Sequence, residues 1–366
     1  MRILYLAPNI PVPGAHGGST HVTSVYRALR RRDEVLLLAR RGSTEPGVLA
    51  VGEGLAPVLK HLAPAYYLAR IAGSVRRFRP EVIYERYSAF GLGVALGRLL
   101  GVPSVLMTLD RDASPISFRG SDRIVATSEA FIPQPYRSKL RLVHWGVDVD
   151  KLAGARGDEV RARVAPRGER VVVYTGSCAR WHGLDVLVDV AARWSGRPVV
   201  FLVVGDGEDL GRVRRLASQA EVAHRFVFTG RVEHDDIGSY LAAADICVAP
   251  YAPARHPIFR RHGMDRDPIK VLEYMALEKP CVTIDTPRMR ALFRGGEEAV
   301  FYPAEDAATL ERELRALLAD PERSARIALA GAELVRRRYT WDRHADELRA
   351  VFEEAIRERA GARERG

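Results

Sequence analysis

Two opposite charges stand three residues apart in the segment DPIKVLEYMALEKP, residues 267–280, whose pattern predicts a helix. Asp267 is a favourable N-cap, and Pro268 suits the first helical position. Lys270 then falls in the first turn, where the helix dipole disfavours a cation by about 0.3–1 kcal/mol. Glu273 comes after the lysine, although the stabilising order is glutamate first. Both charges are misplaced for the helix itself, which points to a ligand.

A nucleotide would account for both charges. Its diphosphate, bound at the helix N-terminus, would use the helix dipole together with the ammonium group of Lys270. The carboxylate of Glu273, one turn further along the same face, could accept hydrogen bonds from a ribose diol. The alternative is an exposed ion pair, which leaves the order of the charges unexplained. We therefore predict that this helix binds a nucleotide.

Two further loops follow predicted strands, where open parallel sheets bind their ligands. The loop PNIPVPGAHGGST carries Gly17 and Gly18, which let backbone N–H groups approach an anion; a flexible loop is the alternative. The loop in VVVYTGSCARWHGLD carries Arg180 and His182, two potential cations that suit a phosphate clamp. A solvated arginine and a structural histidine are the alternative there.

Two more strands end in glycine. Gly205 and Gly207 in VVGDGEDL lack the third glycine of a dinucleotide fingerprint, so they predict either a tight turn or a nucleotide contact. Gly230 and Arg231 in FTGRVEHDDI are open to the same two interpretations. None of these segments is specific by itself.

The elements that must position these residues are short apolar strands alternating with helices. Twelve Val-, Ile- and Leu-rich runs indicate parallel strands buried on both faces, six in each half of the chain. They predict an α/β protein with two Rossmann-like, doubly wound domains. We expect domains at 1–151 and 170–340 with a linker at 152–169. A final helix at 341–366 carries an apolar stripe from Trp341 and need not pack on the second sheet.

Composition limits the class of protein. The chain has 366 residues, 47% hydrophobic and 28% charged, so it is globular. No apolar run reaches the roughly 18 residues of a membrane span, and the N-terminal strand lacks a cleavage site. Cys178, Cys247 and Cys281 lie far apart, in or beside apolar runs. We therefore expect them to be buried thiols. These features predict a cytoplasmic protein without a structural metal.

The net charge of +10 is concentrated near the N-terminus, where residues 1–80 hold twelve Lys or Arg and four Asp or Glu. Segment 60–80 mixes these cations with Leu and Tyr, which suits a helix lying on an anionic membrane surface. A core helix followed by a solvated basic turn is the alternative. Nucleic-acid binding lacks a recognisable motif. We predict a peripheral membrane surface or an anionic lipid-linked acceptor as a partner.

Taken in order, the motifs resemble a known family. GG in the first loop, HWGVD at 144–148, GSCARWHGLD, VVGDGEDL, FTGRV, AAADICVAPY and PIKVLEYMALEKPCV are similar to those of the family 4 (group 1) retaining glycosyltransferases. The likeness covers nearly the whole chain. It implies the GT-B fold, with two Rossmann-like domains facing across a cleft and a last helix that returns to the N-terminal domain.

The resemblance also implies roles for individual residues. Lys270 would bind the donor diphosphate and Glu273 the donor ribose, with Arg180 and Asp265 completing the catalytic group. The predicted donor-binding residues are Gly17, Gly18, Ser177, His182, Gly205, Asp206, Gly207, Gly230 and Arg231. His16, Tyr87 and Asp110 would lie near the acceptor, although Asp110 is equally well explained as a strand cap.

Some positions depart from the family pattern. Ser177 and His182 stand where the family usually has arginine and lysine, so Arg180 would supply the missing cation. Asp265 replaces the first glutamate of the family's acidic pair. The implied reaction needs no protein nucleophile, cofactor or metal, because the leaving phosphate takes the proton of the acceptor hydroxyl. A sugar-nucleotide epimerase or a non-catalytic scaffold with the same fold is the alternative.

Overall fold

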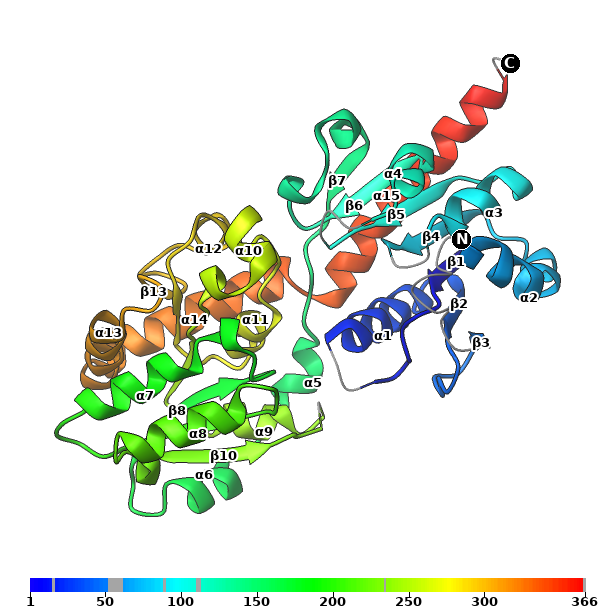
Figure 1. Ribbon diagram of the computed structural model, residues 1–366. Coiled ribbons are helices and arrows are strands. Elements are labelled where there is room, and N and C mark those ends of the chain that lie inside the picture. The colour runs from blue at the N-terminus through cyan, green and yellow to red at the C-terminus, as the bar shows by residue number, and fades with distance from the viewer. Residues whose placement is uncertain (15–16, 52–61, 88–89, 110–112, 234, 365–366) are drawn as a thin grey trace. The chain divides into compact units, whose positions relative to one another are not determined.

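The computed structural model describes residues 1–14, 17–51, 62–87, 90–109, 113–233 and 235–364 (Figure 1). The chain forms two compact domains, each with one sheet. The first domain comprises Met1–Trp145 together with Trp341–Gly366, and the second comprises Gly146–Thr340. Residues 146–151, which the sequence places in the first domain, lie in the second.

The first domain contains a parallel sheet with the strand order β3-β2-β1-β4-β5-β6-β7. Its strands are β1 (Arg2–Ala7), β2 (Glu34–Arg40), β3 (Val48–Val51), β4 (Val82–Arg86), β5 (Ser104–Met107), β6 (Arg123–Ala126) and β7 (Leu140–Leu142). The sequence predicts all of them except β3. This edge strand is short and half-exposed, so it lacks the long apolar run that marks a buried parallel strand.

Helices cover both faces of the first sheet. Along β1, Leu4 and Leu6 point toward α2 (Ala63–Phe78) and α3 (Leu92–Leu100), and Tyr5 points to the opposite face. That opposite face is covered by α1 (Gly17–Arg30) and α15 (Trp341–Glu364), whereas α4 (Pro115–Gly120) packs beside α3. Among the helices of the described residues, none is both long and apolar enough to cross a bilayer.

The second domain repeats this architecture. Its parallel sheet has the order β10-β9-β8-β11-β12-β13. The strands are β8 (Arg170–Thr175), β9 (Val199–Val204), β10 (Phe226–Gly230), β11 (Ile246–Ala249), β12 (Cys281–Ile284) and β13 (Val300–Tyr302). The α-helices that follow β8 in this domain are α7 (Leu184–Arg193), α8 (Leu210–Gln219), α9 (Ile237–Ala242), α10 (Pro257–His262), α11 (Ile269–Ala276), α12 (Pro287–Leu292), α13 (Ala307–Ala319) and α14 (Pro321–Arg338).

The predicted linker is not an extended segment. Residues 152–169 contain the end of α5 (Val149–Ala153) and all of α6 (Asp158–Val164), and both helices belong to the second domain. Asp148 caps α5 by accepting a hydrogen bond from the backbone N–H of Lys151 at 3.1 Å. Val160 and Val164 are buried in the core of the second domain. Gly, Arg and Pro in this stretch therefore mark turns between short helices rather than a free linker.

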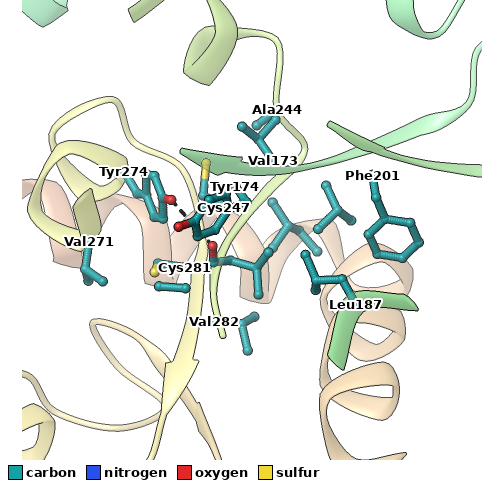
Figure 2. Packing of buried hydrophobic residues seen from close by; sticks show 14 of the residues in the cluster. Val173, Tyr174, Leu187, Phe201, Ala244, Cys247, Val271, Tyr274, Cys281 and Val282 are labelled. Atoms are coloured by element: carbon teal, nitrogen blue, oxygen red, sulfur yellow. Dashed lines mark hydrogen bonds between the residues drawn. The ribbon is translucent and has the colours of Figure 1, made fainter. Parts of the chain in front are cut away.

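The core of the second domain joins α11 to the central strands (Figure 2). Tyr274 points from α11 toward the sheet. Its hydroxyl accepts a hydrogen bond from the backbone N–H of Thr175 at 2.9 Å and lies 3.4 Å from the carbonyl oxygen of Val248. Cys178, Cys247 and Cys281 are free and buried, as the sequence predicts. The hydroxyl of Tyr274 therefore fixes α11 on the ends of β8 and β11.

The last helix, α15, completes the core of the first domain. Leu348 and Phe352 are fully buried among residues of α1, β1 and β4. The carboxylate of Glu354 pairs with Arg123 and Arg141, which lie on β6 and β7. At the start of the helix, Nδ1 of His344 lies 2.7 Å from the carbonyl oxygen of His144. The stripe from Trp341 thus packs on the first sheet rather than on the second.

We predict that Leu348→Ala destabilises the first domain by about 2–5 kcal/mol, because it removes a fully buried side chain and leaves a cavity. The matched control is Leu329→Ala in α14, whose side chain is 55% exposed and should cost less than about 1 kcal/mol. Denaturant unfolding followed by circular dichroism compares the two variants. Equal losses would show that α15 does not contribute to the core as described.

Candidate functional site

The helix that carries Lys270 and Glu273 begins one residue later than the sequence predicts. Pro268 is its N-cap, with φ −86° and ψ 80°, and Ile269 is its first residue. Asp267, the predicted N-cap, is buried and forms an ion pair with Arg288 of α12. A buried carboxylate is stabilised more by a guanidinium than by a backbone N–H. This explains why Asp267 pairs with Arg288 instead of capping the helix.

The ammonium group of Lys270 lies among aromatic groups. Its Nζ donates a hydrogen bond to the hydroxyl oxygen of Tyr174 at 2.8 Å. The same Nζ is 4.0 Å from the ring centre of Tyr174 and 5.1 Å from that of Tyr251. The Tyr174 hydroxyl in turn donates to the carbonyl oxygen of Ser177 at 2.6 Å. The lysine is therefore held in one place by a hydroxyl and two π faces.

Both charged groups of α11 are perturbed by burial. Burial lowers the pKa of Lys270 to about 7, although Cys178 and Glu273 act in the opposite direction. Burial raises the pKa of the Glu273 carboxyl to about 7, against the effects of Lys270 and Lys151. The Glu273 side chain is buried, so the alternative of an exposed ion pair is wrong. A bound anion would return Lys270 to its charged form.

Gly176 provides the space that the Lys270 ammonium occupies. A Cβ atom on Gly176 would lie 2.8 Å from Nζ of Lys270, and the glycine has φ +122°, which side chains disfavour. Its N–H donates to the carbonyl oxygen of Val204 at 2.9 Å, which ties the loop after β8 to β9. Glycine is therefore required on steric grounds at position 176, which opens the motif at 176–185.

Glu273 faces a pocket of about 730 Å³ within the second domain. The pocket is lined by α5 and the residues that follow it, by the start of α9, and by Glu273 itself. Lys151 and Asp235 form an ion pair on its wall. The pocket is large enough to receive a sugar ring or a base beside the Glu273 carboxylate.

Of the two cations predicted after β8, one is buried and the other is exposed. His182 is buried and its ring centre lies 3.7 Å from that of Trp181. Burial lowers the pKa of His182 to about 2, so its imidazole is neutral and cannot serve as a phosphate cation. Its Nδ1 lies 3.3 Å from Oγ of Ser177. Arg180 is exposed, and its side chain makes no hydrogen bond or ion pair within the described residues, so its guanidinium is available to a ligand.

The loops after β9 and β10 lie beside the loop after β8. A Cβ atom on Gly205 would lie 2.0 Å from the carbonyl oxygen of Gly176, so this position requires glycine. The N–H of Gly205 donates to the carbonyl oxygen of Gly230 at 3.0 Å, and that of Cys178 to Asp206 at 2.9 Å. Close backbone packing therefore supports the interpretation of Gly205 as part of a tight turn.

The remaining predicted residues of these loops are exposed. Gly207 donates its N–H to the carboxylate of Asp206 at 2.8 Å. Arg231 directly follows Gly230 and makes no ion pair with any residue that the structure describes. The backbone thus brings together the predicted loops at the carboxyl edge of the second sheet. Among the described residues, neither Arg231 nor Arg180 has a carboxylate partner.

Asp265 lies in the turn before α11. It is partly buried, and burial raises the pKa of its carboxyl despite the opposing charge of Arg288. Oδ2 lies 3.3 Å from the position of a Cβ atom on Gly263, which has φ +79°. The carboxyl group makes no hydrogen bond to the described part of the chain, so it can bind hydroxyl groups of a ligand.

In the first domain, Gly17 and Gly18 open α1. A Cβ atom on Gly17 would meet no atom within 4 Å, so the first turn lies open to a ligand. The buried Arg86, at the end of β4, donates from Nη1 to the carbonyl oxygen of Gly18 at 3.3 Å. Its Cζ is 5.4 Å from the ring centre of Tyr87, which is partly buried. The predicted acceptor residues His16 and Asp110 lie outside the described residues.

Sequence reasoning missed the residues that hold these groups. Tyr174, which lies on β8, and Tyr251, which follows β11, flank the ammonium group of Lys270. Glu85 is buried beside Arg86, accepts the N–H groups of Gly91 and Gly93 at 2.7 and 2.8 Å, and has its pKa raised to about 7 by burial. The signal for Glu85 and Arg86 was present, because two opposite charges end the apolar run VIYER.

Comparisons with known proteins point to one class. A family model described as glycosyl transferases group 1 matches residues 169–320. A 2-deoxystreptamine N-acetyl-D-glucosaminyltransferase of Streptomyces fradiae is 32% identical over 213 residues, which is 48% of this chain and 51% of that protein. The chain spans about half the length of the first curated relatives that it matches.

Other matches are longer. A GDP-mannose-dependent alpha-(1-6)-phosphatidylinositol monomannoside mannosyltransferase of Mycobacterium tuberculosis is 26% identical over 338 residues, or 88% of this chain and 82% of that protein. The structure of Anabaena Alr3699/HepE in complex with UDP is similar with a TM-score of 0.77 at 18% identity, covering 97% of this chain and all of that one. At this identity the structural likeness shows the fold alone, which is two Rossmann-like domains of the GT-B type.

We predict that nucleoside diphosphate binding depends on the protonation of Lys270. Because free Lys270 has a pKa of about 7, it loses its charge as pH rises above 7. Affinity should therefore fall between pH 7 and 9 by up to about tenfold per unit, with uptake of a proton on binding. Calorimetry in buffers of different ionisation enthalpy measures both quantities.

Lys270→Ala is the control for titration of the ligand itself. This variant should bind about ten- to a hundredfold more weakly, because it lacks a charged hydrogen bond of about 1.5–3 kcal/mol. Its affinity should not show the decline with pH that the lysine causes. Identical pH profiles in the two proteins would rule out Lys270 as the phosphate cation.

Proposed function

Because a group 1 glycosyltransferase model matches residues 169–320, we propose that this chain is a glycosyltransferase of that group and transfers a hexosyl unit from a nucleoside-diphosphate sugar to an acceptor hydroxyl, with retention of the anomeric configuration. The observation that carries this proposal is the environment of Lys270. Its ammonium is held over Gly176 by the hydroxyl of Tyr174, at the carboxyl edge of the second sheet. A partly buried cation whose hydrogen-bond partner is a neutral hydroxyl is suited to an anionic ligand.

The other groups of the second domain fit the rest of such a donor. Glu273 lies one helical turn beyond Lys270 and lines a pocket of about 730 Å³, so its carboxylate would accept the ribose hydroxyls. Arg180 and Arg231 would approach the phosphates and the nucleoside. Asp265 would bind hydroxyls of the transferred sugar, since its carboxyl has no hydrogen bond within the described residues.

The proposed reaction needs only positioning and charge stabilisation from the protein. The acceptor oxygen forms a bond to the anomeric carbon on the face that the nucleotide leaves. The bond between that carbon and the phosphate oxygen breaks, and a phosphate oxygen takes the acceptor proton. Lys270 and Arg180 stabilise the charge that develops on the leaving diphosphate. Retention follows because attack and departure share one face of the sugar.

The names of the relatives suggest which donors to test. One mannosyltransferase relative is named as dependent on GDP-mannose, and Anabaena Alr3699/HepE has structures with UDP and with UDP-glucose. We propose a UDP-, GDP- or ADP-linked hexose as the donor. The acceptor is a sugar, a metabolite or a lipid-linked glycan, and Tyr87, at the end of β4, is our candidate for contacting it.

The test is a mass-spectrometric screen of UDP-, GDP- and ADP-sugars for slow hydrolysis of the donor, which needs no knowledge of the acceptor. We expect one nucleotide class to react, and Lys270→Ala and Glu273→Ala each to abolish the reaction. Glu333→Ala, an exposed glutamate on α14, is the matched control and should keep full activity. Both site variants should keep the wild-type circular dichroism spectrum. Donor hydrolysis that survives both substitutions would overturn the proposal.

We also predict that the transfer is independent of divalent metal. The cationic side chains of Lys270 and Arg180 and the backbone N–H groups at the start of α11 would neutralise the leaving diphosphate instead. Activity measured after EDTA treatment should equal that measured with added Mg²⁺ or Mn²⁺. Loss of activity in EDTA, with recovery on adding either ion, would show that a metal ion neutralises the leaving diphosphate.

A further inference from the structure

One helical layer of the first domain has an unusual charge pattern. The helices α2, α3 and α4 cover the same side of the first sheet, with α2 packed beside α3 and α3 beside α4. None of the three helices contains an acidic residue. Their exposed side chains, together with the C-cap of α2, include six arginines: Arg70, Arg76, Arg77, Arg79, Arg98 and Arg119. We call the exposed residues of this layer the α2–α4 face.

These six arginines have no carboxylate partner among the residues that the structure describes. The opposite layer, formed by α1 and α15, is different. Arg31 pairs with Asp342 at 2.5 Å, Arg32 with Asp346 at 2.5 Å, and Arg349 with Asp33 at 3.3 Å. On that side these three arginines are paired with carboxylates, whereas the six arginines of the α2–α4 face have none among the described residues. Unpaired like charges destabilise a folded domain by self-repulsion, unless a partner compensates them.

The helix dipole does not explain this pattern. Cations near a helix C-terminus are favourable, and Arg76, Arg77, Arg98 and Arg119 do lie in last turns. The dipole equally favours acidic residues in the first turn. The first turns of α2, α3 and α4 have none. Selection for helix stability would place acidic residues in the first turns as well as basic residues in the last turns. The net positive charge of the α2–α4 face therefore has another reason.

Large aliphatic side chains accompany these cations. Leu62 before α2 is 60% exposed, Leu99 next to Arg98 is 66% exposed, and Ile116 on α4 is 64% exposed. Single exposed aliphatic residues are common, but here three stand on one cationic layer. Along α2 the buried side chains are Tyr67, Ile71 and Val75, which pack on the sheet. The apolar residues of segment 60–80 therefore divide, with most facing the core and Leu62 facing out.

We propose that the α2–α4 face binds the surface of an anionic lipid bilayer. Arginines would contact lipid phosphates while Leu62, Leu99 and Ile116 enter the boundary between head groups and acyl chains. A nucleic acid would also attract the arginines, but it offers no apolar layer to receive exposed aliphatic side chains. The proposal does not rest on glycosyl transfer, since lipid binding needs neither the donor nor Lys270.

The test is co-sedimentation of the full chain with vesicles of phosphatidylcholine alone or mixed equally with phosphatidylglycerol. We expect binding to require phosphatidylglycerol and to weaken steeply as salt rises from about 0.05 to about 0.5 M, where the Debye length becomes shorter than about 5 Å. Binding that is equal with both vesicle types, or unaffected by salt, would overturn the proposal.

Charge reversal locates the surface. The double variant Arg76→Glu/Arg77→Glu should bind at least about twentyfold more weakly, because each basic residue near an anionic surface contributes roughly fivefold. Arg260→Glu/Arg261→Glu is the matched control, since it reverses two consecutive exposed arginines on α10 of the second domain. The control should bind vesicles like the wild type. Equal weakening in both variants would mean that net charge rather than the α2–α4 face governs binding.

Leu99→Ser provides a test that leaves the charge unchanged. Because the Leu99 side chain is exposed, the substitution should leave the fold intact, and circular dichroism checks this. Weaker vesicle binding than that of the wild type would support entry of the aliphatic groups into the bilayer. A duplex DNA fragment is the competing ligand. Retention of DNA by the wild type, together with failure to sediment with anionic vesicles, would assign the face to nucleic acid and refute the proposal.

Discussion

The space above Gly176 is the constraint on which the candidate donor site depends. Any side chain there would place its Cβ atom 2.8 Å from the ammonium group of Lys270. The lysine reaches that space only because α11 is fixed, through Tyr274, to the backbone of Thr175 at the end of β8. One glycine and one tyrosine hydroxyl thus decide where a positive charge is placed at the carboxyl edge of the sheet.

The same edge is tightened by backbone contacts between successive loops. The N–H groups of Gly176, Cys178 and Gly205 donate to carbonyl groups of neighbouring strand ends. These bonds leave the glycine loops little freedom, so a ligand would meet a preformed surface and lose less affinity to the cost of ordering it. The charged side chains above this surface differ in mobility. Lys270 is held by Tyr174, whereas Arg180 and Arg231 are exposed and would be ordered only by a bound ligand.

The sequence predicts the architecture well because parallel strands buried on both faces need long apolar runs. Twelve of the strands have such runs, and the short edge strand β3 does not. The stripe from Trp341 predicts α15 because its apolar residues recur at helical spacing, as a helix with one buried face requires. The misplaced charges of Lys270 and Glu273 mark α11 as a candidate site from the sequence alone, because their cost is local to one helix. Contacts between residues that are far apart in the sequence leave no pattern within a single strand or helix. The pairing of Asp267 with Arg288 and the burial of His182 were therefore not predictable.

The discontinuous first domain has a consequence for the order of events during synthesis. Its core needs Leu348 and Phe352, which are translated after the whole of the second domain, residues 146–340. At roughly 5–20 residues per second the ribosome takes about 10–40 seconds to cross that interval. During this time the first sheet lacks the helix that covers Tyr5 and Tyr84. The second domain, continuous in sequence, can close its core first. The nascent chain therefore exposes apolar surface at its beginning until its end emerges, which makes the N-terminal half the segment that a chaperone would need to shield.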